Sequence, residues 1–144
     1  VKVPVVAAGG VTDARGIVAA FMLGAAAVQM GTAFLFCPEA KVSKPHREAL
    51  RSATDDGTAL TNLMTGRPAR GLYNRLMREL GPISEAPAFP LSAGAVAPLR
   101  AKAEAAGSGD FSPLWSGQSA SLGVEMPARD LVRKLATEAL QRLR

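Results

Sequence analysis

The sequence has few of the residues that build disulfides and metal sites. Its 144 residues include one cysteine, Cys37, and one histidine, His46. A single cysteine excludes an internal disulfide and any site built from several cysteines, and no metal site is predicted. No apolar run reaches the roughly 18 residues that a membrane-spanning helix needs. The opening residues, "VKVPVVAAGG", also lack the anatomy of a signal peptide, so we expect a cytoplasmic protein with no membrane segment.

Aromatic side chains are scarce too, with one tryptophan and one tyrosine. The formal net charge is +5, but the basic residues are scattered and cluster only mildly near the C-terminus. Without aromatic residues between them, these side chains are interpreted as a solvated face, and no nucleic-acid partner is expected. A hydrophobic content of 48% with 20% charged residues predicts a packed core rather than disorder.

The first part of the chain has the pattern of a βαβ unit. Val3–Ala8 is a short apolar run, which is typical of a parallel strand buried on both faces. Thr12 or Asp13 can then cap a helix, and Gly24 can end it. A second apolar run, Ala25–Met30, follows at once. Strand, helix and strand within about thirty residues match the size of a crossover that joins parallel strands.

Each predicted strand ends in a turn that contains glycine, "GGV" after the first and "MGT" after the second. Ligands bind at the carboxyl ends of parallel strands, and a glycine lets the backbone approach them. The helix that follows offers free N–H groups and a partial positive charge. Two such turns, with nineteen positions from Gly10 to Gln29, resemble the phosphate site of a (β/α)8 barrel. The turns favour a phosphate site and leave its ligand open, since glycine turns also occur wherever a strand meets a helix.

After residue 40 the pattern changes to helix and loop. The basic segment "TGRPARG" is predicted to be a tight loop in which Arg67 and Arg70 either close on an anionic group or lie at the surface. Cys37 is interpreted as a buried, inert thiol, because no base is adjacent to it. Helices are predicted over His46–Ala53, Leu72–Leu80 and Val96–Ala106, and from near Pro127 onward.

The segment "VPVVAAGGVTDARGIVAAFMLGAAAVQMGTAFLFCPEA" resembles the signature of the nitronate monooxygenases, FMN enzymes formerly called 2-nitropropane dioxygenases. The later segments "HREAL", "TGRPARGL", "LWSGQSA" and "PARDLVRKL" also resemble this family, and "QMGT" is the most specific element. The resemblance covers nearly the whole chain, as the C-terminal part of such an enzyme. It implies an α/β fold: the last two βα units of a TIM (β/α)8 barrel in residues 1–40, and a mostly helical segment that packs on the barrel in residues 41–144.

The same resemblance implies that both glycine turns hold the phosphate of FMN, through backbone N–H groups and one threonine hydroxyl. Gln118, in a turn of small polar residues beside Trp115, is expected near the flavin-side substrate cavity, with a helix–helix contact as the alternative. The cofactor-binding residues that the resemblance implies are Gly9, Gly10, Gln29, Met30, Gly31 and Thr32.

The catalytic residues are expected outside this chain. In the family the proposed base is a histidine in a motif rich in glycine and histidine on an earlier strand. His46, in "SKPHREAL", does not match that motif and is interpreted as a surface residue at the start of a helix. The missing N-terminal part of the barrel is therefore expected to be required, and the chain alone is expected to be inactive.

The resemblance implies an FMN-dependent oxidoreductase that oxidises alkyl nitronates with O2 to carbonyl compounds and nitrite. Two alternatives stay open: an FMN- and NAD(P)H-dependent enoyl-acyl-carrier-protein reductase, and a phosphate-ligand-binding or scaffold fragment without catalysis. The sequence leaves open the physiological substrate, the oligomeric state (a homo-oligomer included) and the origin of the shortened chain.

Overall fold

The first and last parts of the chain fold together, and the middle part folds separately. The structure, a computed structural model, describes all residues 1–144. One compact unit comprises residues 1–41 and 117–144, and the other comprises residues 42–116. The last residues belong to the first unit because the C-terminal helix packs against the first helix of the chain.

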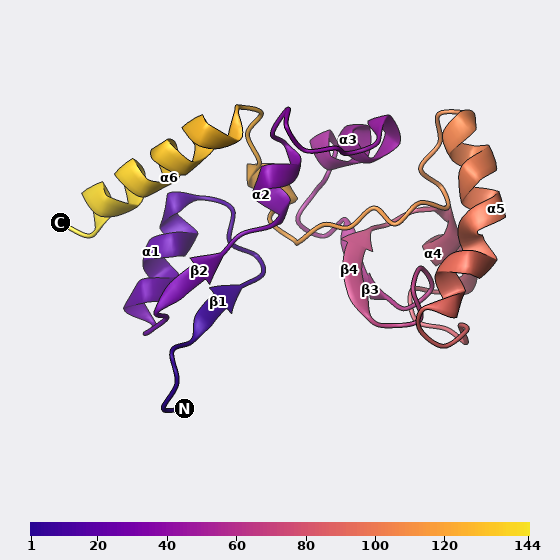
Figure 1. Cartoon of the computed structure of the whole chain (residues 1–144), viewed down its shortest axis with the longest axis horizontal. Coiled ribbons are helices and arrows are strands. Elements are labelled where there is room, and N and C mark those ends of the chain that lie inside the picture. The colour runs from indigo at the N-terminus through magenta and orange to yellow at the C-terminus, as the bar shows by residue number, and fades with distance from the viewer. The chain divides into compact units, whose positions relative to one another are not determined.

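The first unit is built on a parallel βαβ crossover. Strand β1 (Val6–Ala8) and strand β2 (Ala27–Gln29) are joined by helix α1 (Ala14–Met22). The two strands pair in parallel, with Ala7 opposite Val28 (Figure 1). This confirms the predicted unit, although both strands are shorter than the apolar runs that predicted them.

Local signals set the bounds of α1 as predicted. Asp13 is the N-cap, and its carboxylate accepts hydrogen bonds from the N–H groups of Arg15 and Gly16. Gly24 follows the helix with a φ of 95°, a left-handed conformation that glycine adopts without strain.

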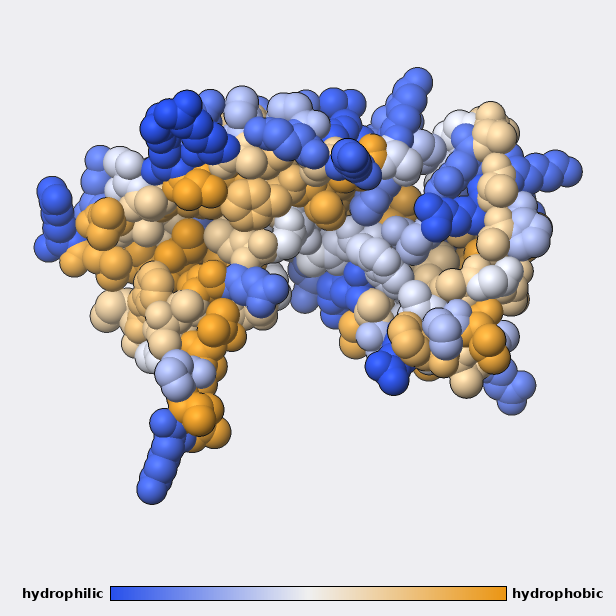
Figure 2. Space-filling view, viewed as in Figure 1, coloured by the Kyte–Doolittle hydropathy of each residue, from blue (hydrophilic) through white to orange (hydrophobic).

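The prediction that both strands are buried on both faces is wrong for this chain. Val5 and Val6 are 46% and 53% exposed. The sheet has two strands, so each has an unpaired edge, and α1 packs against β2 without covering the whole sheet. Figure 2 shows the resulting apolar surface beside the N-terminus.

The core of the first unit lies under the C-terminal helix. Helix α2 (Thr32–Leu35), the short 3-10 helix η1 (Ala120–Leu122) and helix α6 (Ala128–Arg142) come together there. α6 begins directly after Pro127, close to the predicted position. The buried residues of this core are Ala33, Cys37, Leu131 and Leu135.

No helix of the chain is both long enough and apolar enough to cross a membrane.

The second unit combines three helices with a hairpin that the sequence did not predict. The helices are α3 (Lys44–Arg51), α4 (Arg75–Leu80) and α5 (Leu91–Ala105). Strands β3 (Thr58–Thr61) and β4 (Ala69–Leu72) pair in an antiparallel manner. The predicted helices therefore exist with shifted ends, but the predicted "TGRPARG" loop supplies part of a strand.

Tertiary pairing explains the missed hairpin. β4 contains alanine and glycine, which have little intrinsic preference for strands. Gly71 forms an additional bridge to Trp115, and a Cβ on Gly71 would lie 3.0 Å from the carbonyl oxygen of Leu114. The strand is thus stabilised by a segment more than forty residues later, a distance over which local patterns carry no information.

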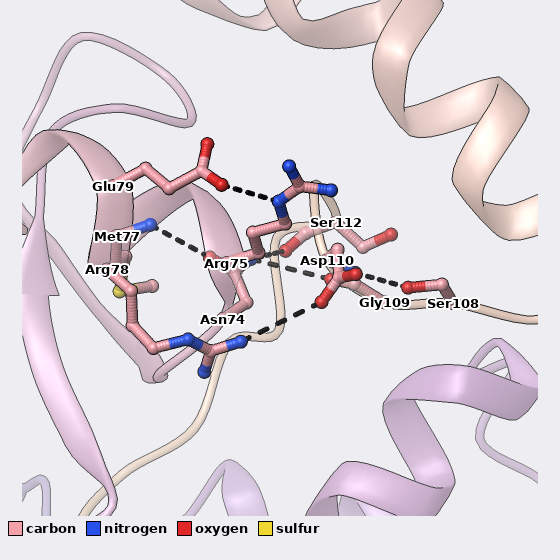
Figure 3. A network of polar contacts seen from close by, with 9 residues as sticks. All are labelled: Asn74, Arg75, Met77, Arg78, Glu79, Ser108, Gly109, Asp110 and Ser112. Carbon is pink, nitrogen blue, oxygen red and sulfur yellow. Dashed lines mark hydrogen bonds and ion pairs between the residues drawn. The ribbon is translucent and has the colours of Figure 1, made fainter.

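A buried asparagine connects α4 to the loop that follows α5. Asn74 caps α4 by accepting a hydrogen bond from the N–H of Met77, and its amide donates to the carbonyl oxygen of Ser112 at 2.9 Å (Figure 3). The N–H of Leu76 donates to the carbonyl oxygen of Asp110 in the same loop. These contacts fix the loop beside the buried cluster of Leu63, Met64, Leu76 and Met77.

Candidate phosphate-binding site

The first glycine turn directly follows β1. Gly9 and Gly10 have φ angles of 89° and 70°, in the left-handed region that other residues rarely adopt. A Cβ added to either glycine would meet no atom within 4 Å. The turn therefore requires glycine for its conformation and leaves open space beside its backbone.

The second glycine turn follows β2 at the same edge of the sheet. Because β1 and β2 are parallel and Ala8 lies opposite Gln29, both turns leave the sheet at the carboxyl ends of the strands. A Cβ on Gly31 would also meet no atom within 4 Å, although its φ of −114° suits any residue. The side chain of Met30 packs against the core of the first unit, which leaves its backbone as the part that faces this edge.

Backbone donors at the two turns are free. The N–H groups of Gly10, Gly31 and Thr32 donate no hydrogen bond within the chain. Free N–H groups at the carboxyl ends of parallel strands are suited to binding an anion.

The N-terminus of α1 offers less than the sequence predicted. The N–H groups of Arg15 and Gly16 already donate to the Asp13 carboxylate, at 3.0 and 3.1 Å. Partial burial raises the pKa of Asp13, but the hydrogen bonds from Arg15 and Gly16 and the charge of Arg15 outweigh it and hold the pKa below its usual value. A carboxylate therefore occupies the position where a helix N-terminus would bind an external anion, and the available donors belong to the glycine turns.

A third segment, Gly117–Ser119, contacts both turns. The N–H of Gly117 donates a 2.8 Å hydrogen bond to Oγ1 of Thr32, after the second turn. The hydroxyl of Ser119 lies 2.5 Å from that of Thr12, after the first turn. Gln118, between them, is exposed. Both contacts join residues far apart in the chain, 85 and 107 positions, so the motif "LWSGQSA" pointed to Gln118 but not to these hydrogen bonds.

His46 lies in the second unit, in the first turn of α3. It is partly buried rather than a surface residue, and its Nε2 donates to the carbonyl oxygen of Trp115 at 2.9 Å. Burial lowers the pKa of His46; the hydrogen bond to Trp115 opposes this shift, and the nearby charge of Arg47 adds to it. His46 therefore has a structural contact within its own unit.

The chain has no group of three or more His, Cys, Asp or Glu residues that could hold a metal ion.

The two arginines of "TGRPARG" also have contacts within the second unit. The guanidinium of Arg70 donates to the hydroxyl and the carbonyl oxygen of Thr58, at 3.1 and 3.3 Å. The guanidinium of Arg67 lies 4.4 Å from the centre of the Phe89 ring. These contacts favour a role within the loop over closure on an anionic ligand.

Comparison with known proteins identifies the family of this chain. A family model described as nitronate monooxygenase matches residues 1–138. The chain belongs to the nitronate monooxygenase family. The resemblance found in its sequence motifs is thereby confirmed.

The curated relatives within the nitronate monooxygenase family are much longer than this chain. It is 47% identical over 139 residues to the nitronate monooxygenase of Pseudomonas aeruginosa, covering 95% of the chain and 40% of that protein. It is 39% identical over 140 residues to a probable nitronate monooxygenase of Staphylococcus saprophyticus, covering 96% of the chain and 39% of that protein. The chain thus spans about two fifths of the length of these relatives.

Solved structures confirm an α/β fold for this family member. Nitroalkane oxidase from Streptomyces ansochromogenes matches with a TM-score of 0.87 and 41% identity, over 98% of this chain and 40% of the other. FabK from Thermotoga maritima matches with a TM-score of 0.76 and 31% identity, over 99% of this chain and 46% of the other.

Proposed function

We propose that this chain is the phosphate-binding part of an FMN-dependent oxidoreductase that oxidises alkyl nitronates with O2 to carbonyl compounds and nitrite. The observation that carries the proposal is the pair of open glycine turns at one edge of a parallel sheet, in a chain of the nitronate monooxygenase family. Because the chain spans about 40% of its relatives, the activity is that of the whole protein. The catalytic base is then supplied by residues outside this chain.

The two turns fit the phosphate of FMN. A dianion needs several donors, and the N–H groups of Gly10, Gly31 and Thr32 and the Thr32 hydroxyl supply four. The open space beside the three glycines leaves room for phosphate oxygens to approach. When bound, FMN supplies the redox chemistry, and these residues hold and orient its phosphate tail. The proposed cradle consists of Gly9, Gly10, Gln29, Met30, Gly31 and Thr32.

We further propose that β1 and β2 are the last two strands of a (β/α)8 barrel. Parallel sheets normally have both faces covered, yet Val6 on β1 and Val5 just before it are exposed in this chain. The strands of the remaining barrel would pair with the open edges and cover this apolar surface (Figure 2). Gln118 at the substrate cavity, the division of the chain at residue 40 and a homo-oligomeric state stay predictions.

Substrate assays on the whole protein test this proposal. We expect release of nitrite and consumption of O2 when an alkyl nitronate is added, and loss of both after the flavin is removed. Flavin absorbance of the purified protein is the first measurement. A colourless protein that cannot be reconstituted with FMN would favour the binding or scaffold alternative.

The likeness to FabK keeps one enzymatic alternative, an FMN- and NAD(P)H-dependent enoyl-acyl-carrier-protein reductase. That likeness is weaker, with a TM-score of 0.76 against 0.87 for nitroalkane oxidase. Oxidation of NAD(P)H driven by an enoyl thioester, without any turnover of nitronate, would replace our proposal by this alternative.

A further inference from the structure

Residues Gly117–Ser119, which we call the strap, lie against both glycine turns of the first unit. At one end of the strap, the N–H of Gly117 donates a hydrogen bond to Oγ1 of Thr32. At the other end, the hydroxyl of Ser119 forms a hydrogen bond with the hydroxyl of Thr12. Gln118 stands between Gly117 and Ser119, and consecutive Cα atoms are about 3.8 Å apart, so Gln118 lies close to both contacts. The strap therefore spans the edge where the two turns meet.

The contact at Gly117 determines what the Thr32 hydroxyl can do. A threonine hydroxyl has one proton to donate and two lone pairs to accept with. The N–H of Gly117 occupies a lone pair, and the hydroxyl donates to no other group of the chain. The proton of Thr32 is therefore not used within the chain and is available to a ligand beside Gly31.

The backbone of the strap also approaches the first turn closely. A Cβ on Gly117 would lie 3.4 Å from Oγ1 of Thr32 and 3.7 Å from the backbone nitrogen of Gly10, which is itself one of the free donors. An anion held by that donor is thus adjacent to the strap. Gln118 is exposed, and its amide makes no hydrogen bond within the chain.

We propose that the strap is a third side of the phosphate site. Gly117 is a positioning residue that orients the Thr32 hydroxyl, and the amide of Gln118 donates to the phosphate end of a phosphate monoester. This inference rests on the proposed function, in which the glycine turns bind the phosphate of FMN. It assigns Gln118 to the phosphate, whereas the sequence had suggested the substrate cavity.

Charge reversal at Gln118 tests the contact. The whole flavoprotein is stripped of flavin, and its affinities for FMN and for riboflavin, which lacks the phosphate, are measured by quenching of flavin fluorescence. Gln118→Glu places a negative charge beside the phosphate, so we expect about tenfold weaker FMN binding at low salt. Riboflavin binding should change less than about twofold. Gln141→Glu, at an exposed position of α6, is the matched control and should change neither affinity.

A pair of variants at Gly117 tests the positioning role. Gly117→Ala and Gly117→Pro both add a Cβ, which the 3.4 Å separation allows, but only proline removes the N–H. We expect Gly117→Pro to weaken FMN binding about fivefold more than Gly117→Ala, with no such difference for riboflavin.

Three outcomes would overturn the inference. Equal losses for FMN and riboflavin would mean that the strap has a purely structural role. A wild-type protein that prefers FMN, combined with an unchanged preference in Gln118→Glu, would remove the strap from the site while leaving the proposed function in place. A wild-type protein that binds both flavins equally would overturn the phosphate site and the strap together.

Discussion

The side-chain amide of Asn74 donates a 2.9 Å hydrogen bond to the carbonyl oxygen of Ser112, thirty-eight positions later in the chain. The same side chain accepts from the N–H of Met77 and so caps α4 (Figure 3). Asn74 is 3% exposed, so neither hydrogen bond has water as an easy substitute. One buried residue thus joins a helix start to the loop after α5.

Asn74→Ala should destabilise the second unit by about 2–3 kcal/mol, because it removes a helix cap and leaves a buried carbonyl oxygen without a donor. Asn74→Ser retains an oxygen that can cap α4 but is too short to reach Ser112, so about half of this loss is expected. Denaturant titration of both variants gives the free energies of unfolding. Equal losses for the two variants would assign the whole effect to the contact with Ser112.

Gly31→Val should abolish retention of FMN in the whole protein while leaving the fold intact. The φ of Gly31, −114°, suits a β-branched residue, and the new side chain would fill the open space beside the turn. Gly10→Val is a less selective test, because its φ of 70° also strains the backbone. Flavin absorbance after gel filtration reports retention. Gly94→Ala, where a Cβ also meets no atom, is the control in α5 and should leave flavin content unchanged.

Titration of His46 should make stability depend on pH in the weakly acidic range. Burial lowers the pKa of His46 in the folded state below the unfolded value of about 6.5. The unfolded state then binds more protons, so stability is complete above the unfolded pKa and decreases as the pH falls below it, towards the folded pKa. Unfolding measured between pH 5 and pH 8 should show this loss. As the chain has no other histidine, His46→Gln should flatten the profile near pH 6.

The parts of the fold that the sequence predicted well depend on local signals. The apolar run before Gly9, the N-cap Asp13 and the glycine stop at Gly24 all act within a few residues. These signals were enough to predict a parallel βαβ unit with glycine turns at the carboxyl ends of its strands. The sequence also indicates Asp13 as a cap, but only the structure shows that its carboxylate occupies the N–H groups of Arg15 and Gly16.

The parts that were missed depend on contacts between distant residues. β4 is stabilised as a strand by pairing with β3 and by the bridge from Gly71 to Trp115. The strap is held at the candidate site by Thr12 and Thr32, residues from the opposite end of the chain. Neither pairing leaves a periodic pattern in the sequence. The small residues of "SGQSA" were the one local sign that this segment packs over a cavity.

The C-terminal helix should contribute to the stability of the first unit through two leucines. Leu131 and Leu135, which are 3% and 6% exposed, pack with Ala33 and Cys37, whereas Leu140 on the same helix is 61% exposed. Leu131→Ala should therefore destabilise the unit by about 2–5 kcal/mol, since it removes buried apolar contacts and leaves a cavity.

Leu140→Ala makes the same chemical change at an exposed position of α6 and should alter stability by less than about 0.5 kcal/mol. Both variants retain helix propensity, because alanine and leucine are strong helix formers, so the difference between them measures packing alone. Thermal unfolding followed by circular dichroism compares the two. Similar losses in both variants would mean that α6 is packed in a different rotation from that described, with Leu140 buried in the whole protein.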